Sequence, residues 1–204
     1  NGGTTYYAES VDTVADNMIE VKPTVVIAVP RLYEKIHAKV LDKVSCDPPV
    51  RQKIFWWAIN VGTKAAKYLT RGQEPTGWLR MQFKIADKLV FSKLKEKVGG
   101  RLRCFISGGA PLSAEVGKFF ASANIPILEG YGLTETSPVI TCNREELYKF
   151  GTVGSPIDGV EVKIEEDGEI ICRGDNIMKG YYKNPEATRE VLNDDGWFKT
   201  GDIG

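Results

Sequence analysis

The chain has 204 residues, of which 42% are hydrophobic, so it is long enough to bury the core of one domain and part of a second. Its 27 basic residues balance its 27 acidic residues, and this balance gives no sign of a nucleic-acid-binding protein. No stretch is long and apolar enough to span a bilayer, and the first residues lack the pattern of a signal peptide. Because it starts without Met and stops at KTGDIG, we expect the chain to be a piece of a longer protein.

The cysteines and the one histidine limit the kinds of metal site and catalytic site that we expect. The four cysteines show no CxxC spacing, which argues against a zinc site and suits a reducing cytosol. The one histidine, His37, lies in the sequence RLYEKIHAKV, which predicts an exposed helix and a solvated side chain. A serine or cysteine hydrolase would have to use His37 as its base, so we set hydrolase functions aside.

The sequence of the first half of the chain predicts one strand and several helices. Residues 8–20 predict a short helix, and the β-branched run from Thr24 to Val29 predicts a strand buried on both faces. Pro30 ends that strand, and helical periodicity follows it. Two longer helices come next, with one apolar face each, formed by Ile54, Trp57, Ala58, Val61, Ala65, Tyr68 and Leu69 on the first and by Leu79, Phe83, Ala86, Val90 and Leu94 on the second.

Two further strands each run into a glycine-rich segment. Residues 102–106 predict a second buried strand, which ends in SGGAPLS and precedes a helix capped by Ser113. Residues 126–128 predict a third strand, which runs into GYGLTETSP. Strand–helix–strand repetition implies a parallel sheet with helices on its faces, and such sheets bind ligands outside the carboxyl ends of their strands. Both glycine-rich segments are predicted to lie there.

The pattern changes after about Phe150. Turn signals every few residues and alternating strands predict a smaller antiparallel barrel or sheet. The predicted fold is therefore α/β: a parallel sheet with flanking helices in residues 1–148, then an antiparallel β-rich subdomain in residues 149–204.

The segment GYGLTETSP has the composition of a nucleotide site. Gly130 and Gly132 thin the backbone, and Tyr131 between them offers a flat face to a base. The Thr134 hydroxyl could donate to a phosphate, and Glu135 offers a hard oxygen ligand to Mg²⁺. A carboxylate beside a phosphate needs such a cation, because the two charges repel. The alternative is a loop whose hydroxyls cap their own backbone.

The segment SGGAPLS suits the approach of a flat ligand, because two glycines leave no Cβ in the way. The alternative is an ordinary strand-to-helix turn. Neither a Walker loop nor a GxGxxG fingerprint occurs in the chain.

Four motifs in register, namely SGGAPLS, GYGLTETSP, GEIICRGDNIMKGYYKNPEAT and GWFKTGD, resemble the core motifs of the adenylate-forming enzymes. The stretch VKPTVVIAVPRLYEKI is similar to the long-chain fatty acyl-CoA synthetases within them. The resemblance implies a two-step reaction in which ATP and a fatty acid give acyl-AMP, and CoA then takes the acyl group. ATP or AMP, Mg²⁺ and CoA are the implied cofactors and co-substrates.

The resemblance also implies roles for individual residues. Thr134 would hold the α-phosphate, Glu135 would bind Mg²⁺, and these two would be the catalytic residues. Asp202 would accept hydrogen bonds from the ribose. The remaining nucleotide contacts would be an adenine pocket at Gly109, Ala110 and Pro111, a base stacked on Tyr131, and a border of the adenylate at Gly130, Gly132 and Leu133.

The family's upstream phosphate loop and its lysine-bearing C-terminal domain have no counterpart in the chain, so we expect the isolated chain to bind AMP without turnover. A fatty acyl-AMP ligase, an aryl-CoA ligase and a non-catalytic AMP-binding module stay open as alternatives. We expect a cytoplasmic protein, and a homodimer is kept open.

The charge is unevenly distributed. Residues Arg51–Arg103 contain 13 basic and three acidic side chains, with Phe55, Trp56 and Trp57 among them. Such a stretch could dock on anionic lipid or attract the phosphates of CoA. The simpler interpretation, which we favour here, is a solvated helix surface over buried tryptophans.

Overall fold

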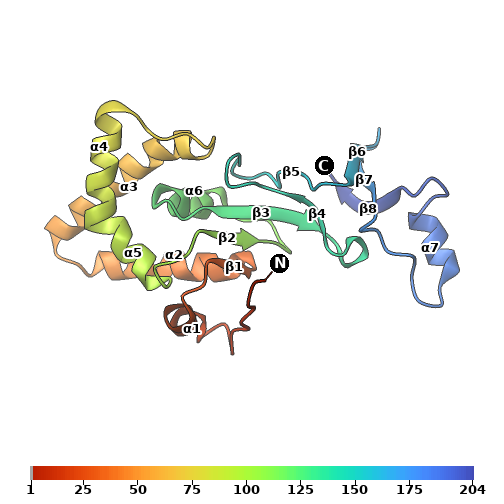
Figure 1. Cartoon of the computed structure of the whole chain (residues 1–204), viewed down its shortest axis with the longest axis horizontal. Helices are drawn as coiled ribbons and strands as arrows, with labels where there is room; N and C mark the ends of the chain where they lie inside the picture. Colours follow the sequence, from red (N-terminus) through yellow and green to blue (C-terminus); the bar gives the residue numbers. More distant parts are fainter. Residues whose placement is uncertain (1) are drawn as a thin grey trace. The chain divides into compact units, whose positions relative to one another are not determined.

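The structure is a computed structural model that describes residues 2–204, with helices and strands in the order drawn in Figure 1. The helices are α1 Val14–Val21, α2 Pro30–Ser45, α3 Pro49–Leu69, α4 Gly77–Ala86, the π-helical η1 Asp87–Phe91, α5 Ser92–Lys97, α6 Ala114–Ser122, the 3₁₀ helix η2 Thr134–Thr136 and α7 Pro185–Val191. The strands are β1 Val25–Ala28, β2 Cys104–Ser107, β3 Ile127–Gly132, β4 Val139–Cys142, β5 Ser155–Pro156, β6 Val160–Ile164, β7 Glu169–Gly174 and β8 Phe198–Ile203. No helix within residues 2–204 is long and apolar enough to cross a membrane.

The chain divides into two compact units. Unit 1 runs to Leu128 and includes Arg144–Thr152, and unit 2 comprises Glu129–Asn143 and Val153–Gly204. The division into residues 1–148 and 149–204, expected from the change of pattern near Phe150, stays a prediction.

Unit 1 contains the predicted parallel strands. β1 pairs in parallel with β2, in a register that places Val25 opposite Cys104 and Ala28 opposite Ser107. β2 lies between β1 and the start of β3, where the Phe105 amide donates to the Pro126 carbonyl at 2.9 Å. The parallel pairing predicted from strand–helix–strand repetition is confirmed.

The prediction that β1 is buried on both faces is wrong. Val25 and Ile27 are 39% and 76% exposed, whereas Val26 and Ala28 pack against the core. Within residues 2–204, β1 pairs only with β2 and is an edge strand. A continuous apolar run shows that a strand is apolar, but it does not show what covers each face.

The core of unit 1 joins α2, β2 and α6. Tyr33 of α2 is fully buried, and its hydroxyl donates to the Ile106 carbonyl at 2.6 Å, so α2 is tied to the end of β2. Its ring packs on Phe105 with the centroids 4.9 Å apart. His37, one turn later, is half-buried against Phe119 at 4.3 Å, so the expected solvated position was wrong.

Helix α3 packs closely on α6. A Cβ on Gly62 would lie 2.2 Å from the Ser122 carbonyl oxygen, so only glycine allows this approach. The predicted apolar face of α3 is partly wrong, because Ile54, Trp57 and Tyr68 are exposed. The face predicted for the second long helix is confirmed, since all five of its residues belong to the core or pack against it, but they lie on three successive elements, α4, η1 and α5.

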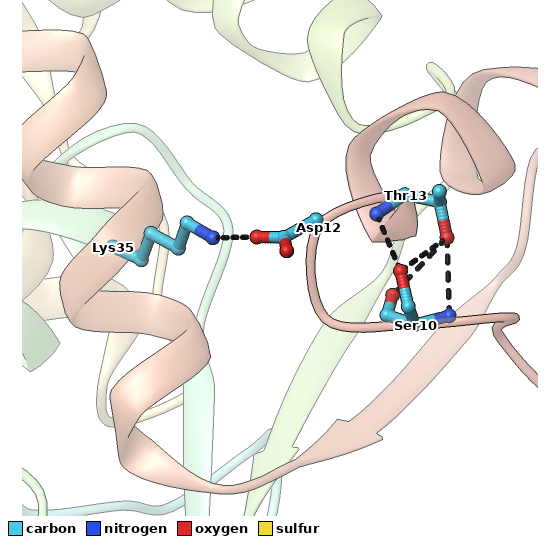
Figure 2. Close-up of polar contacts among 4 residues, drawn as sticks. All are labelled: Ser10, Asp12, Thr13 and Lys35. Atoms are coloured by element: carbon cyan, nitrogen blue, oxygen red, sulfur yellow. Dashed lines mark hydrogen bonds and ion pairs between the residues drawn. The ribbon is translucent and has the colours of Figure 1, made fainter.

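The N-terminal segment is held by local polar contacts (Figure 2). Lys35 of α2 forms an ion pair with Asp12, and the hydroxyls of Ser10 and Thr13 bond with each other and with each other's backbone. These bonds compete with helical ones, so α1 begins at Val14 rather than at residue 8.

Unit 2 is built from antiparallel strands. β4 lies between the end of β3 and β5, and a separate sheet has the order β6-β7-β8. Ile140, Cys172 and Phe198 form the buried centre of this unit. The predicted fold class, a sheet with parallel strands followed by an antiparallel β-rich part, is confirmed.

Candidate nucleotide-binding site

The two glycines of GYGLTETSP serve different purposes. They lie on β3 itself rather than in a loop, so this strand is longer than predicted. A Cβ on Gly132 would lie 1.7 Å from the Pro138 carbonyl oxygen, so the fold requires glycine there. A Cβ on Gly130 would come no closer than 3.5 Å to any neighbour, which is ordinary contact. Gly130 is therefore not needed by the fold, and its bare backbone is free for a ligand to approach.

The two threonines of the motif point to different environments. Thr136 is fully buried, accepts a hydrogen bond from the Leu133 amide at 3.0 Å and donates its own hydroxyl proton to a carbonyl of the same turn. Thr134 is exposed, and within residues 2–204 its hydroxyl has no hydrogen-bond partner. The turn thus holds its own shape through Thr136 and leaves Thr134 available, as a phosphate contact requires.

Glu135 lies between these threonines and is held from outside the turn. Its Oε1 accepts a hydrogen bond from the Tyr181 hydroxyl at 3.0 Å, and this bond raises the pKa of Tyr181. Its backbone carbonyl accepts a bond from the Met178 amide at 2.7 Å. Oε2 has no partner among residues 2–204, so one carboxylate oxygen is occupied and the other is available.

Tyr131 and Asp202 come together although 71 residues separate them. The Tyr131 hydroxyl donates to Asp202 Oδ2 at 2.7 Å. Burial and the Asp202 carboxylate raise the pKa of Tyr131 to about 12, so the phenol remains a donor at neutral pH. Tyr131 and the neighbouring Leu133 also pack against the core of unit 2, so the predicted base and ribose contacts share one rigid support.

These residues fit a magnesium ion that is bound mainly through substrate. No group of three or more His, Cys, Asp or Glu side chains in residues 2–204 could hold a metal alone. Mg²⁺ commonly takes one or two carboxylates and completes its shell with water and phosphate oxygens. The available Glu135 oxygen and the adjacent Thr134 hydroxyl match that requirement, so Glu135 would hold the ion and the ion would neutralise phosphate charge.

The SGGAPLS segment, with Gly109, Ala110 and Pro111, belongs to unit 1. All three are exposed directly after β2. Gly109 has φ +81°, a conformation that favours glycine, and a Cβ there would meet only the Val29 side chain, at 3.9 Å. Ser113 stands at the N-cap position of α6, but its side chain makes no capping hydrogen bond, contrary to the prediction.

The sequence analysis missed Asn176, Met178 and Tyr181. All three lie within the motif GEIICRGDNIMKGYYKNPEAT, which contributed to the resemblance without any role for them. The Asn176 amide nitrogen donates to the carbonyls of Thr136 and Val139, at 2.9 and 3.0 Å. No local pattern could have found these contacts, since they join segments about 40 residues apart.

A protein-family model described as AMP-binding enzyme matches residues 1–182. The chain belongs to the family of AMP-binding enzymes. Among the relatives of this chain, the long-chain-fatty-acid–CoA ligase FadD15 of Mycobacterium bovis is 40% identical over 183 residues, covering 90% of this chain and 30% of that protein. The peroxisomal long chain acyl-CoA synthetase 7 of Arabidopsis thaliana is 38% identical over 214 residues, covering 98% of this chain and 29% of that protein.

Solved structures agree with this membership. The ATP-bound MatB of Rhodopseudomonas palustris matches with a TM-score of 0.58 and 27% identity, over 96% of this chain and 30% of that one. The chain spans about a third of the length of the relatives that it matches.

Proposed function

We propose that this chain is the adenylate-binding part of an AMP-forming long-chain fatty acid–CoA ligase. The carrying observation is the arrangement in unit 2, where an unpartnered Thr134 hydroxyl stands beside a half-occupied Glu135 carboxylate and Tyr131 contacts Asp202. The names of the relatives support the substrate class, since they are fatty-acid–CoA ligases at up to 40% identity.

The proposed reaction has two balanced steps. A fatty acid carboxylate oxygen bonds to the α-phosphorus of ATP, and pyrophosphate leaves with the electrons of the broken P–O bond. The CoA thiolate then bonds to the acyl carbon, and AMP leaves. In the first step the Thr134 hydroxyl would donate to an α-phosphate oxygen, where negative charge accumulates, and Glu135 would hold Mg²⁺. Asp202 would accept from the ribose hydroxyls, and Tyr131 would support the base.

The test is ATP–pyrophosphate exchange by a protein that carries this chain within the length of its relatives. Glu135→Gln keeps the shape of the side chain and removes its charge, so exchange should fall at least about tenfold at limiting Mg²⁺. Glu166→Gln is the matched control, because Glu166 is an exposed carboxylate of unit 2 in the turn between β6 and β7. Wild-type exchange in the Glu135 variant would remove that residue from the metal role.

The two steps separate this proposal from its alternatives. A fatty acyl-AMP ligase would show exchange without CoA thioester formation, and an aryl-CoA ligase would prefer aromatic acids. A non-catalytic module would bind AMP and show no exchange. We further propose that the 204-residue chain alone binds AMP without forming thioester.

We also propose a peripheral contact with anionic membranes, through α3 and α4 of a cytoplasmic protein. The expectation of buried tryptophans was wrong, because Trp56, Trp57 and Trp78 are 52%, 36% and 67% exposed. On α4 the exposed Trp78, Met81 and Ile85 recur every three or four residues, and the helix also carries Arg80 and Lys84. Sedimentation with anionic vesicles should carry the protein down, and Trp78→Ser should reduce that binding. Equal binding to neutral vesicles, or none, would contradict the proposal.

A further inference from the structure

The segment after β7 makes three contacts with the turn that contains Thr134, Glu135 and Thr136. The Asn176 amide bridges the carbonyls of Thr136 and Val139, so it joins the end of η2 to the start of β4. The Met178 amide bonds to the Glu135 carbonyl at 2.7 Å and fixes the backbone of that residue. Tyr181 then reaches the side chain of the same glutamate at 3.0 Å. Both the backbone and the carboxylate of Glu135 are therefore set by one segment.

Tyr181 is itself anchored. Its amide donates to the Thr188 hydroxyl at 2.9 Å, and that hydroxyl donates to the Asn184 carbonyl at 2.8 Å. The Asn184 side chain caps α7 through the Ala187 amide. A Cβ on Gly180 would lie 2.8 Å from Thr188, so the chain passes this helix too closely for any other residue. The phenol thus projects from a fixed backbone and is not carried by a free loop end.

The same arrangement occurs at the second carboxylate of the site. Asp202 accepts from the Tyr131 hydroxyl on one oxygen, as Glu135 accepts from Tyr181 on one oxygen. A carboxylate with one oxygen bonded to a phenol samples fewer orientations before a ligand arrives. The other carboxylate oxygen then has a preferred orientation, and less conformational entropy is lost when the carboxylate binds a ligand.

Resting on the proposed function, we propose that Tyr181 and Tyr131 are positioning residues, each of which uses its hydroxyl to orient one ligand-binding carboxylate. Tyr181 orients Glu135 toward a divalent cation, and Tyr131 orients Asp202 toward the ribose diol. Tyr131 therefore contributes a hydroxyl as well as the aromatic face predicted from the sequence. The two pairs act on different parts of the nucleotide, so their effects are separable.

Two single-atom deletions test this proposal. Tyr181→Phe and Tyr131→Phe keep the rings and remove the hydroxyls, in a protein that carries this chain within the length of its relatives. Tyr182→Phe is the matched control, because Tyr182 is the adjacent tyrosine, is 87% exposed and has its ring near Lys183. For each protein two quantities are measured. The first is the Mg²⁺ concentration at half-maximal ATP–pyrophosphate exchange. The second, the AMP ratio, is the affinity for AMP divided by the affinity for 2′-deoxy-AMP, both from calorimetric titration.

We expect each variant to move one quantity only. Tyr181→Phe should raise the half-maximal Mg²⁺ concentration by about three- to tenfold and leave the AMP ratio unchanged. Tyr131→Phe should lower the AMP ratio by about three- to tenfold and leave the Mg²⁺ dependence unchanged. Tyr182→Phe should change neither.

The outcomes separate this inference from the proposed function. A wild-type protein with Mg²⁺-dependent exchange whose two variants match it would overturn the positioning role and leave the proposed function standing. Variants that both lose both quantities together, with a lower unfolding midpoint, would show that the hydroxyls only hold the fold, and this would also overturn it. A wild-type protein that neither binds AMP nor exchanges pyrophosphate would overturn both.

Discussion

The two glycine-rich segments look alike in sequence, but the structure supports them in different ways. Residues 130–138 in unit 2 are held by side chains: Thr136 from within, and Asn176 and Tyr181 from a distant segment. Residues 107–113 in unit 1 make few such contacts, and the Ser113 side chain does not cap α6. They are held by the bond from the Gly108 amide to the Ala28 carbonyl at 3.3 Å and by the burial of the Leu112 side chain in the core of unit 1.

The difference in support between the two segments indicates which of them must hold its atoms at fixed positions. A phosphate and a cation must be met by polar atoms at fixed positions, and hydrogen bonds from side chains hold those atoms in place. A flat base needs an open surface, which exposed small residues such as Ala110 provide. Substitutions at the supporting positions should therefore lower the unfolding free energy strongly in residues 130–138 and weakly in residues 107–113.

The largest contrast is expected between Gly132 and Gly109. Gly132→Ala places a Cβ against the Pro138 carbonyl and should cost about 3 kcal/mol or more of unfolding free energy, since neither strand can move away freely. Gly109→Ala meets only Val29 at 3.9 Å and should cost about 1 kcal/mol, because the strain is confined to φ. Denaturant unfolding followed by circular dichroism measures both. Equal losses would mean that the two segments are supported alike.

A smaller contrast is expected between the two threonines. Thr136→Val keeps the shape but removes the hydroxyl that accepts from the Leu133 amide and donates to the Pro138 carbonyl, which should cost about 1–3 kcal/mol. Thr134→Val should leave unfolding unchanged and weaken AMP binding, because its hydroxyl faces solvent. The same denaturant curves, with a calorimetric AMP titration, test the pair. A stability loss at Thr134 with unchanged AMP affinity would reverse the assignment.

The smallest expected effect is a dependence of stability on pH that unit 1 has and unit 2 lacks. Burial against Phe119 lowers the pKa of His37, with Glu115 opposing, so the folded state favours the neutral ring. Stability from this group is present above the unfolded pKa of about 6.5 and is lost as the pH falls through the lower folded value. Because His37 is the one histidine, unit 2 should lack this dependence. Hydrogen exchange between pH 7 and 5 should show unit 1 opening more easily, and His37→Phe should reduce that change. An unaltered pH profile in the variant would contradict this.

The sequence predicted which segments carry the site, but not how they are held. The nine residues of GYGLTETSP predicted that Thr134 contacts phosphate and that Glu135 binds a metal, because each residue type has a distinct chemistry, and both roles stay predictions. They could not show that Thr136 faces inward, since both threonines look equivalent until the turn is folded. The partners of the turn, Asn176 and Tyr181, were out of reach for the same reason: long-range pairing has no local signature.

Burial was predicted less well than element type. The strand at residues 24–29 was correctly placed, yet its exposed Ile27 was not foreseen, because apolar composition does not tell an edge strand from a central one. The helix at residues 49–69 was likewise found, while Trp57 and Tyr68 lie outside its packed face. The roles of Gly109, Ala110 and Pro111 at the adenine stay a prediction.

The most direct test of the nucleotide site is a calorimetric titration of the 204-residue chain with AMP and with 2′-deoxy-AMP, before and after Asp202→Ala. We predict that the wild-type chain binds AMP weakly and prefers it to 2′-deoxy-AMP. A charged hydrogen bond to the ribose is worth roughly 1.5–3 kcal/mol, so the variant should lose about tenfold or more in AMP affinity and with it the preference. If the two ligands are discriminated equally well before and after the substitution, Asp202 does not bind the ribose and the proposed site is wrong.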